Sequence, residues 1–346
     1  MGNLAIGGDT PISVQSMTNT ATKDVSATVA QIHRLEKAGC DLARVAVPDQ
    51  EAADVLGEIK SRIHIPLAAD IHFDYRLALA AIKQGVDKLR LNPGNIKSPD
   101  KIKLIADKAK EGGIPIRIGV NAGSIDRKRY GLPTPETLVQ SALDEVELLE
   151  SRGFSDIVIS LKSFDVPTTI EAYRLAASKV DYPLHLGVTE AGLLWQGTIR
   201  SAVGIGTLLA EGIGDTLRVS LTAEPEEEVK VGIEILKSLG LREHGFTIIS
   251  CPTCARCGID LVGVVTEVQR RLEQIRDLPP IKVAVMGCVV NGPGEARDAD
   301  VGIAGAKDGG VIFSGGRAVK KVSADRMVDE LLNEVRRVAR KPQHEE

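Results

Sequence analysis

Four of the chain's five cysteines lie in its last third, at spacings that suit a metal centre. Cys251 and Cys254 form a Cys-x-x-Cys pair, Cys257 follows at the same interval, and Cys288 lies further along the chain. A Cys-x-x-Cys pair brings two thiolates onto one metal centre from a single turn, and a distant cysteine completes the site when the chain folds back. The pattern therefore indicates bound iron or zinc.

The spacing favours iron in a cluster with mixed ligands. A zinc ribbon is expected to use two separate Cys-x-x-Cys pairs, which this region lacks. Glu295 ends the turn-rich segment Asn291–Glu295 and offers a hard oxygen ligand beside three thiolates of a cubane cluster. The three cysteines from Cys251 onward also have the spacing of a ferredoxin segment. Cys257 therefore competes with Cys288 and Glu295 for a place among the ligands.

A second set of candidate residues is basic and lies within short apolar runs. In four runs an arginine precedes a small or polar residue by two positions: Arg44-x-Ala46, Arg90-x-Asn92, Arg117-x-Gly119-x-Asn121 and Arg218-x-Ser220. Positions two apart share one face of a strand, so each arginine lies on the same face as its partner. Because a buried guanidinium without a partner is costly, four in phase indicate a bound phosphate or diphosphate.

Three further runs end in side chains that can bind substrate or move protons. Asp70 and His72 end one run, Lys162 ends another, and a third runs from His185 to Glu190. Active sites of barrel enzymes form at the carboxyl ends of the strands, where these residues are expected. A single interior arginine is more often a structural ion pair, whereas this grouping favours a functional site. Glu190 is out of phase with His185, so the pattern does not fix its direction.

The candidate residues belong to eight apolar runs that alternate with charged, amphipathic stretches. This alternation predicts successive βα units, and the number of runs predicts a (β/α)₈ TIM barrel. The runs are Pro11–Met17, Leu42–Val47, Pro66–Ile71, Lys88–Pro93, Ile114–Asn121, Asp156–Lys162, Pro183–Glu190 and Asp215–Thr222. Between the first two, Thr28–Ala38 has the periodicity of an amphipathic helix that ends at Gly39.

The rest of the chain predicts a small α+β domain that carries the cysteines. We place the barrel domain at residues 1–245 and the cluster domain at 246–346. The predicted elements are a helix over Leu261–Ile275, strands Ile281–Met286, Asp300–Ile303 and Gly310–Phe313, and a helix over Asp325–Arg340. In the first helix Val262, Val265, Val268 and Leu272 are expected to face inward.

Composition limits the classes of function that remain. The chain has 346 residues, 43% of them hydrophobic, and a net charge of −4. Its lysines and arginines form no basic block, which excludes a general nucleic-acid surface and leaves small anions as ligands. No apolar run approaches the roughly 20 residues of a membrane span, and Met1–Ala5 lacks the apolar region of a signal peptide. We expect a cytoplasmic protein whose cysteines are thiols or metal ligands.

Six segments together resemble the family of 4-hydroxy-3-methylbut-2-enyl diphosphate synthases. They are Gln15–Asn19, Asp70–Asp74, Leu91–Asn95, Gly187–Gly192, Cys251–Cys254 and Gly287–Glu295. The resemblance runs nearly end to end and is to the short bacterial form, a barrel followed directly by an iron–sulfur domain. The chain departs from the family pattern in two places. The basic segment that usually precedes the first strand is shortened to Met1–Ala5, and Cys257 is additional to the family's ligands.

The resemblance implies a reaction and a role for each candidate residue. The reaction is reductive ring opening of 2-C-methyl-D-erythritol 2,4-cyclodiphosphate in the non-mevalonate isoprenoid pathway, with electrons from flavodoxin or ferredoxin. The 4Fe–4S ligands correspond to Cys251, Cys254, Cys288 and Glu295. Glu190 handles a proton, and Glu295 is an exchangeable ligand that substrate oxygen can replace. Substrate is bound by Arg44, Asp70, His72, Arg90, Asn92, Arg117, Asn121, Lys162, Arg218 and Ser220.

The resemblance also implies a homodimer in which the cluster domain of each subunit caps the barrel of the other. Two alternatives from other classes remain open on the residues alone. One is a barrel enzyme of pterin-type condensation chemistry whose cysteines hold structural zinc. The other is an electron-transfer or cluster-carrier protein whose barrel arginines are structural.

Overall fold

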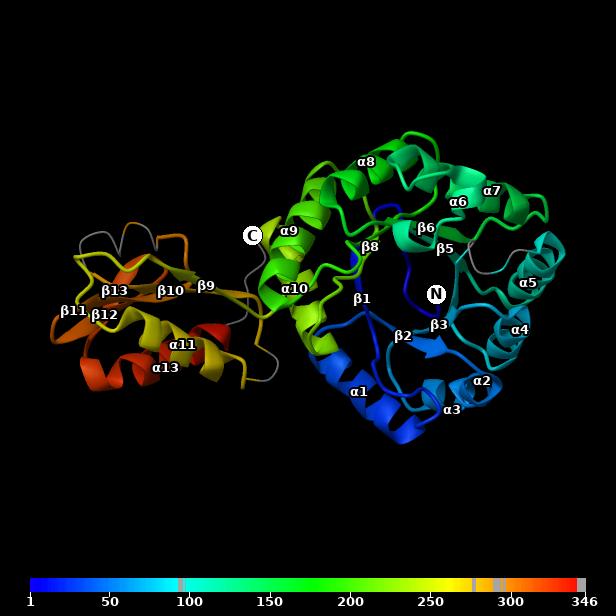
Figure 1. Ribbon diagram of the computed structural model, residues 1–346. Helices are drawn as coiled ribbons and strands as arrows, with labels where there is room; N and C mark the ends of the chain where they lie inside the picture. Colours follow the sequence, from blue (N-terminus) through cyan, green and yellow to red (C-terminus); the bar gives the residue numbers. More distant parts are fainter. Residues whose placement is uncertain (93–95, 97, 276–277, 289–293, 295–296, 341–346) are drawn as a thin grey trace. The chain divides into compact units, whose positions relative to one another are not determined.

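The computed structural model describes residues 1–92, 96, 98–275, 278–288, 294 and 297–340 (Figure 1). The chain divides into two compact units, Met1–Arg242 and Glu243–Glu346. Each unit has its own hydrophobic core.

The first unit is built on eight parallel strands. They are β1 (Ser13–Met17), β2 (Leu42–Val47), β3 (Leu67–Ile71), β4 (Lys88–Leu91), β5 (Ile116–Asn121), β6 (Ile157–Lys162), β7 (His185–Leu186) and β8 (Thr216–Leu217). The strand order is β6-β5-β4-β3-β2-β1-β8-β7, and a parallel bridge between Ile159 and Leu184 closes the ring. The predicted TIM barrel is confirmed.

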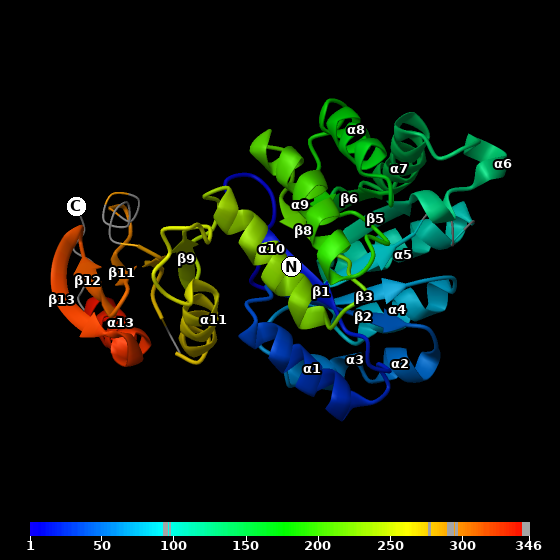
Figure 2. The ribbon, with the colours of Figure 1, turned by 60° about the vertical axis from the view of Figure 1, so that its left-hand side comes forward.

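Ten α-helices of the described chain surround these strands (Figures 1 and 2). They are α1 (Val25–Lys37), α2 (Gln50–Asp54), α3 (Leu56–Ser61), α4 (Tyr75–Lys83), α5 (Pro99–Gly112), α6 (Arg127–Tyr130), α7 (Pro135–Glu150), α8 (Val166–Ala177), α9 (Leu194–Ala210) and α10 (Pro225–Ser238). Aspartates cap several of them: Asp24, Asp74 and Asp165 each accept a backbone N–H in the first turn of the helix that follows. Within the described residues, no helix is both long and apolar enough to cross a membrane.

The last two barrel strands are shorter than their apolar runs predict. β7 and β8 pair over only two residues each, His185 with Thr216 and Leu186 with Leu217. The runs continue because the loops that follow are also buried, as the fully buried Val188 and Val219 show. The apolar runs therefore predicted correctly which residues are buried, but they overestimated the length of the strands.

In the part of the second unit that the structure describes, a five-stranded sheet packs with helices α11 (Leu261–Leu272) and α13 (Met327–Ala339). The strands are β9 (Phe246–Ser250), β10 (Ile281–Met286), β11 (Val301–Ala306), β12 (Gly309–Ser314) and β13 (Arg317–Ser323). The order is β13-β12-β11-β10-β9, with parallel pairing from β9 to β11 and antiparallel pairing beyond. Both helices contribute to one core with Val283, Val285 and Ile303 of the sheet.

Three details of this unit differ from the sequence prediction. β13 was not predicted, because its lysine-rich, mostly exposed residues carry no alternation of buried and exposed positions. β9 was interpreted only as a segment leading into the cysteines. Val262 was expected to face inward but is 64% exposed, whereas Leu261 is buried in the core instead.

Candidate functional site

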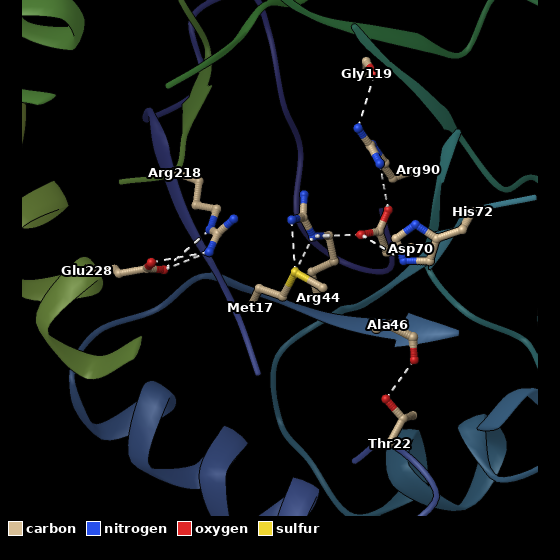
Figure 3. Close-up of polar contacts among 10 residues, drawn as sticks. All are labelled: Met17, Thr22, Arg44, Ala46, Asp70, His72, Arg90, Gly119, Arg218 and Glu228. Atoms are coloured by element: carbon tan, nitrogen blue, oxygen red, sulfur yellow. Dashed lines mark hydrogen bonds and ion pairs between the residues drawn. The ribbon is translucent and has the colours of Figure 1, made fainter. Parts of the chain in front are cut away.

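Asp70 lies at the centre of a buried polar network inside the barrel (Figure 3). Arg90 donates a hydrogen bond of 3.1 Å to its Oδ1, and Arg44 Nε lies 3.7 Å from its Oδ2. His72 Nε2 lies 3.9 Å from the same Oδ2. Adjacent parallel strands position these groups, since Asp70 pairs with Arg90 in the register of β3 and β4. One carboxylate thus faces two guanidinium groups.

The other donors of these two arginines find weak or neutral acceptors, and Arg90 Nε finds none among the described residues. Arg44 Nε and Nη2 lie 3.1 and 2.9 Å from Met17 Sδ, and Arg90 Nη2 donates to Gly119 O at 3.1 Å. A thioether sulfur is a weak acceptor. Burial lowers the pKa of Arg44 to about 10, with Asp70 opposing the change. The site therefore retains donor capacity for an added anion.

Arg218 has its own carboxylate partner on the opposite side of the view in Figure 3. It donates to both oxygens of Glu228 on α10, at 3.2 to 3.3 Å. Glu228 also accepts hydrogen bonds from Ser16 Oγ and Leu221 N, so its carboxylate is fully engaged. This buried glutamate holds Arg218 in place.

Several buried basic side chains have no carboxylate partner among the described residues. Nε and Nη1 of Arg117 and Nζ of Lys88 have no hydrogen-bond partner, and neither does Nε2 of His185. Burial, aided by nearby arginines, lowers the pKa of Arg117 and of Lys88 well below their ordinary values. Burial together with Arg117 and Arg218 does the same for Lys162.

Two glycines, one within β5 and one just after β7, make room for these basic side chains. A Cβ on Gly119 would lie 2.5 Å from Arg90 Nε, and one on Gly187 would lie 2.5 Å from Lys162 Nζ. The backbone thus leaves space for long cationic side chains in the barrel interior. Four arginines and two lysines face two carboxylates, Asp70 and Glu228, in this part of the described chain. An anion is the ligand that such an arrangement binds best.

The polar candidates lie where strands β4, β5 and β8 end. Asn92 is buried and its Nδ2 donates to Ser124 Oγ at 2.9 Å. Asn121, the last residue of β5, and Ser220, three residues after β8, are both half-buried. They are therefore accessible at the same end of the barrel as Asp70 and His72.

Glu190 lies apart from the buried network and is exposed. Among the described residues other than glycine, Glu190 has a positive φ, of 53°. This left-handed conformation is uncommon for a residue with a Cβ and is often found at functional turns. It turns the chain between β7 and α9.

The cysteines of the second unit follow two adjacent strands. Cys251 directly follows β9 and Cys288 follows β10 by two residues, and these strands are parallel neighbours. Gly287 N donates to Cys251 Sγ at 3.2 Å. Backbone N–H groups directed at cysteine sulfurs are one of the features that tune iron–sulfur clusters. Cys254 is exposed, and the backbone N–H and side chain of Arg256 lower the pKa of its thiol.

Cys257 occupies a different environment from the other three. Its Sγ donates to Ile259 O at 3.2 Å, and it packs against the core of the second unit. A Cβ on Gly287 would lie 2.6 Å from this sulfur. Cys257 thus packs beneath the backbone that presents Cys288. Glu295, expected as the fourth ligand, lies outside the described residues.

Sequence reasoning missed three residues of the barrel site. Lys88 shares the strand face of Arg90 and Asn92, so the same two-residue spacing identifies it. Met17 and Glu228 carried no such signal. A methionine is common at the end of a strand, and Glu228 is one of three acidic residues in the first turn of α10, where acidic residues are common.

Two sequence profiles together match most of the chain. The GcpE TIM-barrel domain matches residues 1–233, and the GcpE protein C-terminal domain matches residues 247–337. The chain belongs to the GcpE family. Both parts of the predicted architecture, a barrel and a separate C-terminal domain, are those of this family.

Curated relatives are similar to the chain over nearly its whole length. The protein of Caldanaerobacter subterraneus subsp. tengcongensis is 60% identical over 98% of this chain and 96% of its own length. That of Clostridium perfringens is 58% identical over 96% of this chain and 95% of its own length. Both are named 4-hydroxy-3-methylbut-2-en-1-yl diphosphate synthase (flavodoxin). The resemblance found in the sequence is confirmed, and the chain is an enzyme of this family.

Solved structures with a similar barrel are much more distant. Dihydropteroate synthase of Yersinia pestis is 12% identical, with a TM-score of 0.51 over 67% of this chain and 92% of that chain. N-acetylneuraminic acid synthetase of Leptospira borgpetersenii is 15% identical, with a TM-score of 0.51 over 80% of this chain and 96% of that chain. At such identities the likeness shows the fold alone.

Proposed function

We propose that the chain converts 2-C-methyl-D-erythritol 2,4-cyclodiphosphate into 4-hydroxy-3-methylbut-2-enyl diphosphate, a step of the non-mevalonate isoprenoid pathway. The conversion takes up two electrons and two protons. It breaks the carbon–oxygen bond that closes the ring and releases one hydroxyl group as water. The observation that carries the proposal is the excess of buried cations in the barrel of a chain whose relatives bear this synthase's name.

The barrel cations bind the diphosphate of the substrate in this proposal. Arg117 and Lys162 lack carboxylate partners among the described residues, so a diphosphate can compensate their charge. Arg44, Arg90 and Arg218 are held in place by Asp70 and Glu228 and add further donors. Charge-assisted hydrogen bonds to phosphate are among the strongest in proteins. The polar candidates His72, Asn92, Asn121 and Ser220 then contact the hydroxyl groups.

Glu190 is the proposed proton donor. Loss of a hydroxyl group as water requires a proton at the departing oxygen, and a carboxyl group is a common general acid. Glu190 is accessible and its strained turn fixes its backbone position. Asp70 orients the substrate together with Asn121, since its carboxylate is already directed by two arginines.

Cys251, Cys254, Cys288 and Glu295 are the residues that would hold a 4Fe–4S cluster. The three cysteines follow neighbouring parallel strands, one sulfur accepts a backbone N–H, and one thiol has a lowered pKa, all of which suit thiolate ligands. Such a cluster supplies electrons one at a time. The proposed donor is flavodoxin, which the relatives' name includes, or ferredoxin. In this proposal Cys257 is not a ligand, which the hydrogen bond from its sulfur to Ile259 O supports.

A turnover assay tests the proposed reaction. Cluster-loaded protein, reduced flavodoxin and the cyclodiphosphate are incubated without oxygen, and the product is detected by mass spectrometry. We expect 4-hydroxy-3-methylbut-2-enyl diphosphate, with kcat lowered about 100-fold or more in Glu190→Gln. Arg117→Met is expected to raise KM, whereas Arg127→Met, on an exposed residue of α6, serves as the matched control. Absence of product from protein that contains the full iron and sulfide content would refute the proposal.

A further inference from the structure

Two histidines and a glutamate gather at the end of the barrel opposite Asp70. His33 and Glu36 lie in the last turns of α1, which leads into β2. His64 lies between α3 and β3, just before the strand begins. One potential ligand atom from each residue lies within 4.8 Å of the other two. The group therefore joins a helix to the entrance of a neighbouring strand.

Backbone hydrogen bonds orient two of these side chains. His33 Nε2 lies 2.8 Å from Arg62 O, so Nε2 carries the proton and Nδ1 keeps its lone pair. Glu36 Oε1 accepts hydrogen bonds from the backbone N–H of His64, at 2.6 Å, and of Ile65, at 3.3 Å. Histidines and carboxylates that bind metals are typically held in this way through the atom that does not face the ion.

His64 and Glu36 are already in contact through the atoms that would bind an ion. His64 Nδ1 donates a hydrogen bond of 3.0 Å to Glu36 Oε2. A metal ion that replaces the proton of Nδ1 would bridge these two atoms.

The third ligand can reach the same point. The rings of His33 and His64 are stacked, with centroids 5.6 Å apart. Both side chains are exposed, so a small rotation about their side-chain bonds costs little.

We propose that His33, Glu36 and His64 form a binding site for Zn²⁺ or a similar divalent transition metal, with water in the fourth position. Two imidazoles and a carboxylate are a ligand set that zinc uses with a water molecule. The site lies at the amino-terminal ends of the barrel strands, opposite the end at which barrel active sites form. By linking α1 to the entrance of β3, bound metal stabilises the barrel. The inference does not depend on the proposed reaction.

Cobalt titration tests this site. Cluster-loaded protein is titrated anaerobically with Co²⁺, whose visible bands report its coordination, and Zn²⁺ is then added as competitor. We expect one Co²⁺ per chain with nitrogen and oxygen ligands, displaced by Zn²⁺. Affinity should fall about tenfold or more in His33→Gln and in His64→Gln. His244→Gln, an exposed histidine of the second unit, is the matched control and should bind as the unsubstituted chain does.

Two readouts separate this site from metal at the cysteines. Co²⁺ bound by thiolates gives an intense near-ultraviolet band, which the proposed site must lack. Zn²⁺ should raise the melting temperature of the barrel by a few degrees in the unsubstituted chain and not in the double variant His33→Gln/His64→Gln. Equal Co²⁺ binding by the double variant and the unsubstituted chain would overturn the proposal, as would absence of binding at submillimolar Co²⁺.

Discussion

Asp70 illustrates how much of the barrel site depends on one residue. Its carboxylate is buried and faces Arg44 and Arg90. Burial raises the pKa of Asp70, but the surrounding charges, chiefly the two arginines, together lower it by more than burial raises it. The pKa of Asp70 therefore lies below its ordinary value. A carboxyl group with a lowered pKa stabilises the fold above its unfolded-state pKa and loses this contribution as pH falls through the folded-state pKa. Asp70 is therefore one source of acid sensitivity.

Replacing Asp70 by asparagine should destabilise the barrel. Asp70→Asn leaves two buried guanidinium groups without their shared counter-charge, and loss of one partner of a buried pair costs about 3–5 kcal/mol. Urea denaturation measures the change in the free energy of unfolding. Asp74→Asn makes the same change in a half-buried helix cap whose only ion pair among the described residues is with the exposed Arg76. Asparagine caps a helix equally well and an exposed ion pair contributes little, so this variant should lose about 1 kcal/mol or less. Pyrophosphate should restore part of the stability of Asp70→Asn. An Asp70→Asn variant as stable as Asp74→Asn would show that the pairing contributes nothing.

A second carboxylate, outside the site, has the opposite behaviour. Burial raises the pKa of Glu145, on α7, to about 7, with nearby Asp144 also raising it and Arg129 opposing. The folded chain therefore binds this proton more tightly than the unfolded chain, and the free energy of unfolding falls as pH rises from about 4.5 to 7.

Substitution of Glu145 should remove this pH dependence. Glu145→Gln is expected to raise the free energy of unfolding by about 2 kcal/mol at pH 8 and by little near pH 4.5. Glu147→Gln changes an exposed residue of the same helix and is the control. Denaturation at the two pH values checks the prediction. A gain of equal size at both would contradict it, because the gain would then not come from titration.

Single residues were predictable from the sequence where spacing repeats, and not otherwise. Arg44, Arg90, Arg117 and Arg218 repeat one spacing in four of the apolar runs, so their shared face followed from strand geometry. Glu228 reaches Arg218 from a helix, and Met17 contacts Arg44 from the neighbouring strand β1. Such contacts depend on how helices and strands pack against one another. The residues next to Glu228 or Met17 in the sequence do not show this packing.

At the scale of elements, the barrel depends on close approaches that glycine permits. Gly187 follows β7, and a Cβ there would lie 2.6 Å from Arg218 O of the backbone as well as 2.5 Å from Lys162 Nζ. The lysine can move, but the carbonyl cannot move without shifting β8. The short pairing of β7 with β8 therefore needs glycine at this position.

Gly187→Ala should destabilise the chain by about 1–3 kcal/mol, because it overpacks a rigid contact. The matched control is Gly206→Ala in α9, where a Cβ would meet no atom within 4 Å. There alanine should stabilise the helix by up to about 1 kcal/mol, since it has the higher helix propensity. Urea denaturation of both variants gives the comparison. Similar effects of the two substitutions would show that the backbone contact at Gly187 is not tight.

Element existence was predictable along most of the chain, and element ends were less so. The eight barrel strands and helices α11 and α13 of the second unit follow from apolar periodicity. The ends of β7 and β8 did not, because buried loops are as apolar as strands. β13 was not predicted, because this mostly exposed edge strand has no apolar face that would mark it in the sequence.

At the scale of the whole molecule, the proposed anion-binding residues and the cysteines belong to different compact units. We propose a homodimer in which the cluster domain of one subunit completes the barrel site of its partner. This proposal is supported by the division of the chain into two units that each have a core of their own.

Complementation between two inactive variants tests the shared site. Cys288→Ser removes a proposed cluster ligand, and Glu190→Gln removes the proposed proton donor. In mixed dimers, one of the two sites combines an intact barrel with an intact cluster domain only if sites are formed between subunits. We expect verified heterodimers to recover about half of the specific activity. Heterodimers as inactive as either parent would contradict the arrangement.

The most direct test of the account is whether the cyclodiphosphate acts at an iron–sulfur cluster. Iron, sulfide and zinc are assayed without oxygen, and EPR spectra of dithionite-reduced protein are recorded before and after the substrate is added. The account predicts about four irons per chain, consistent with one cubane cluster, and an EPR signal that changes with substrate. Zinc without iron, or an iron signal that the substrate leaves unchanged, would contradict it.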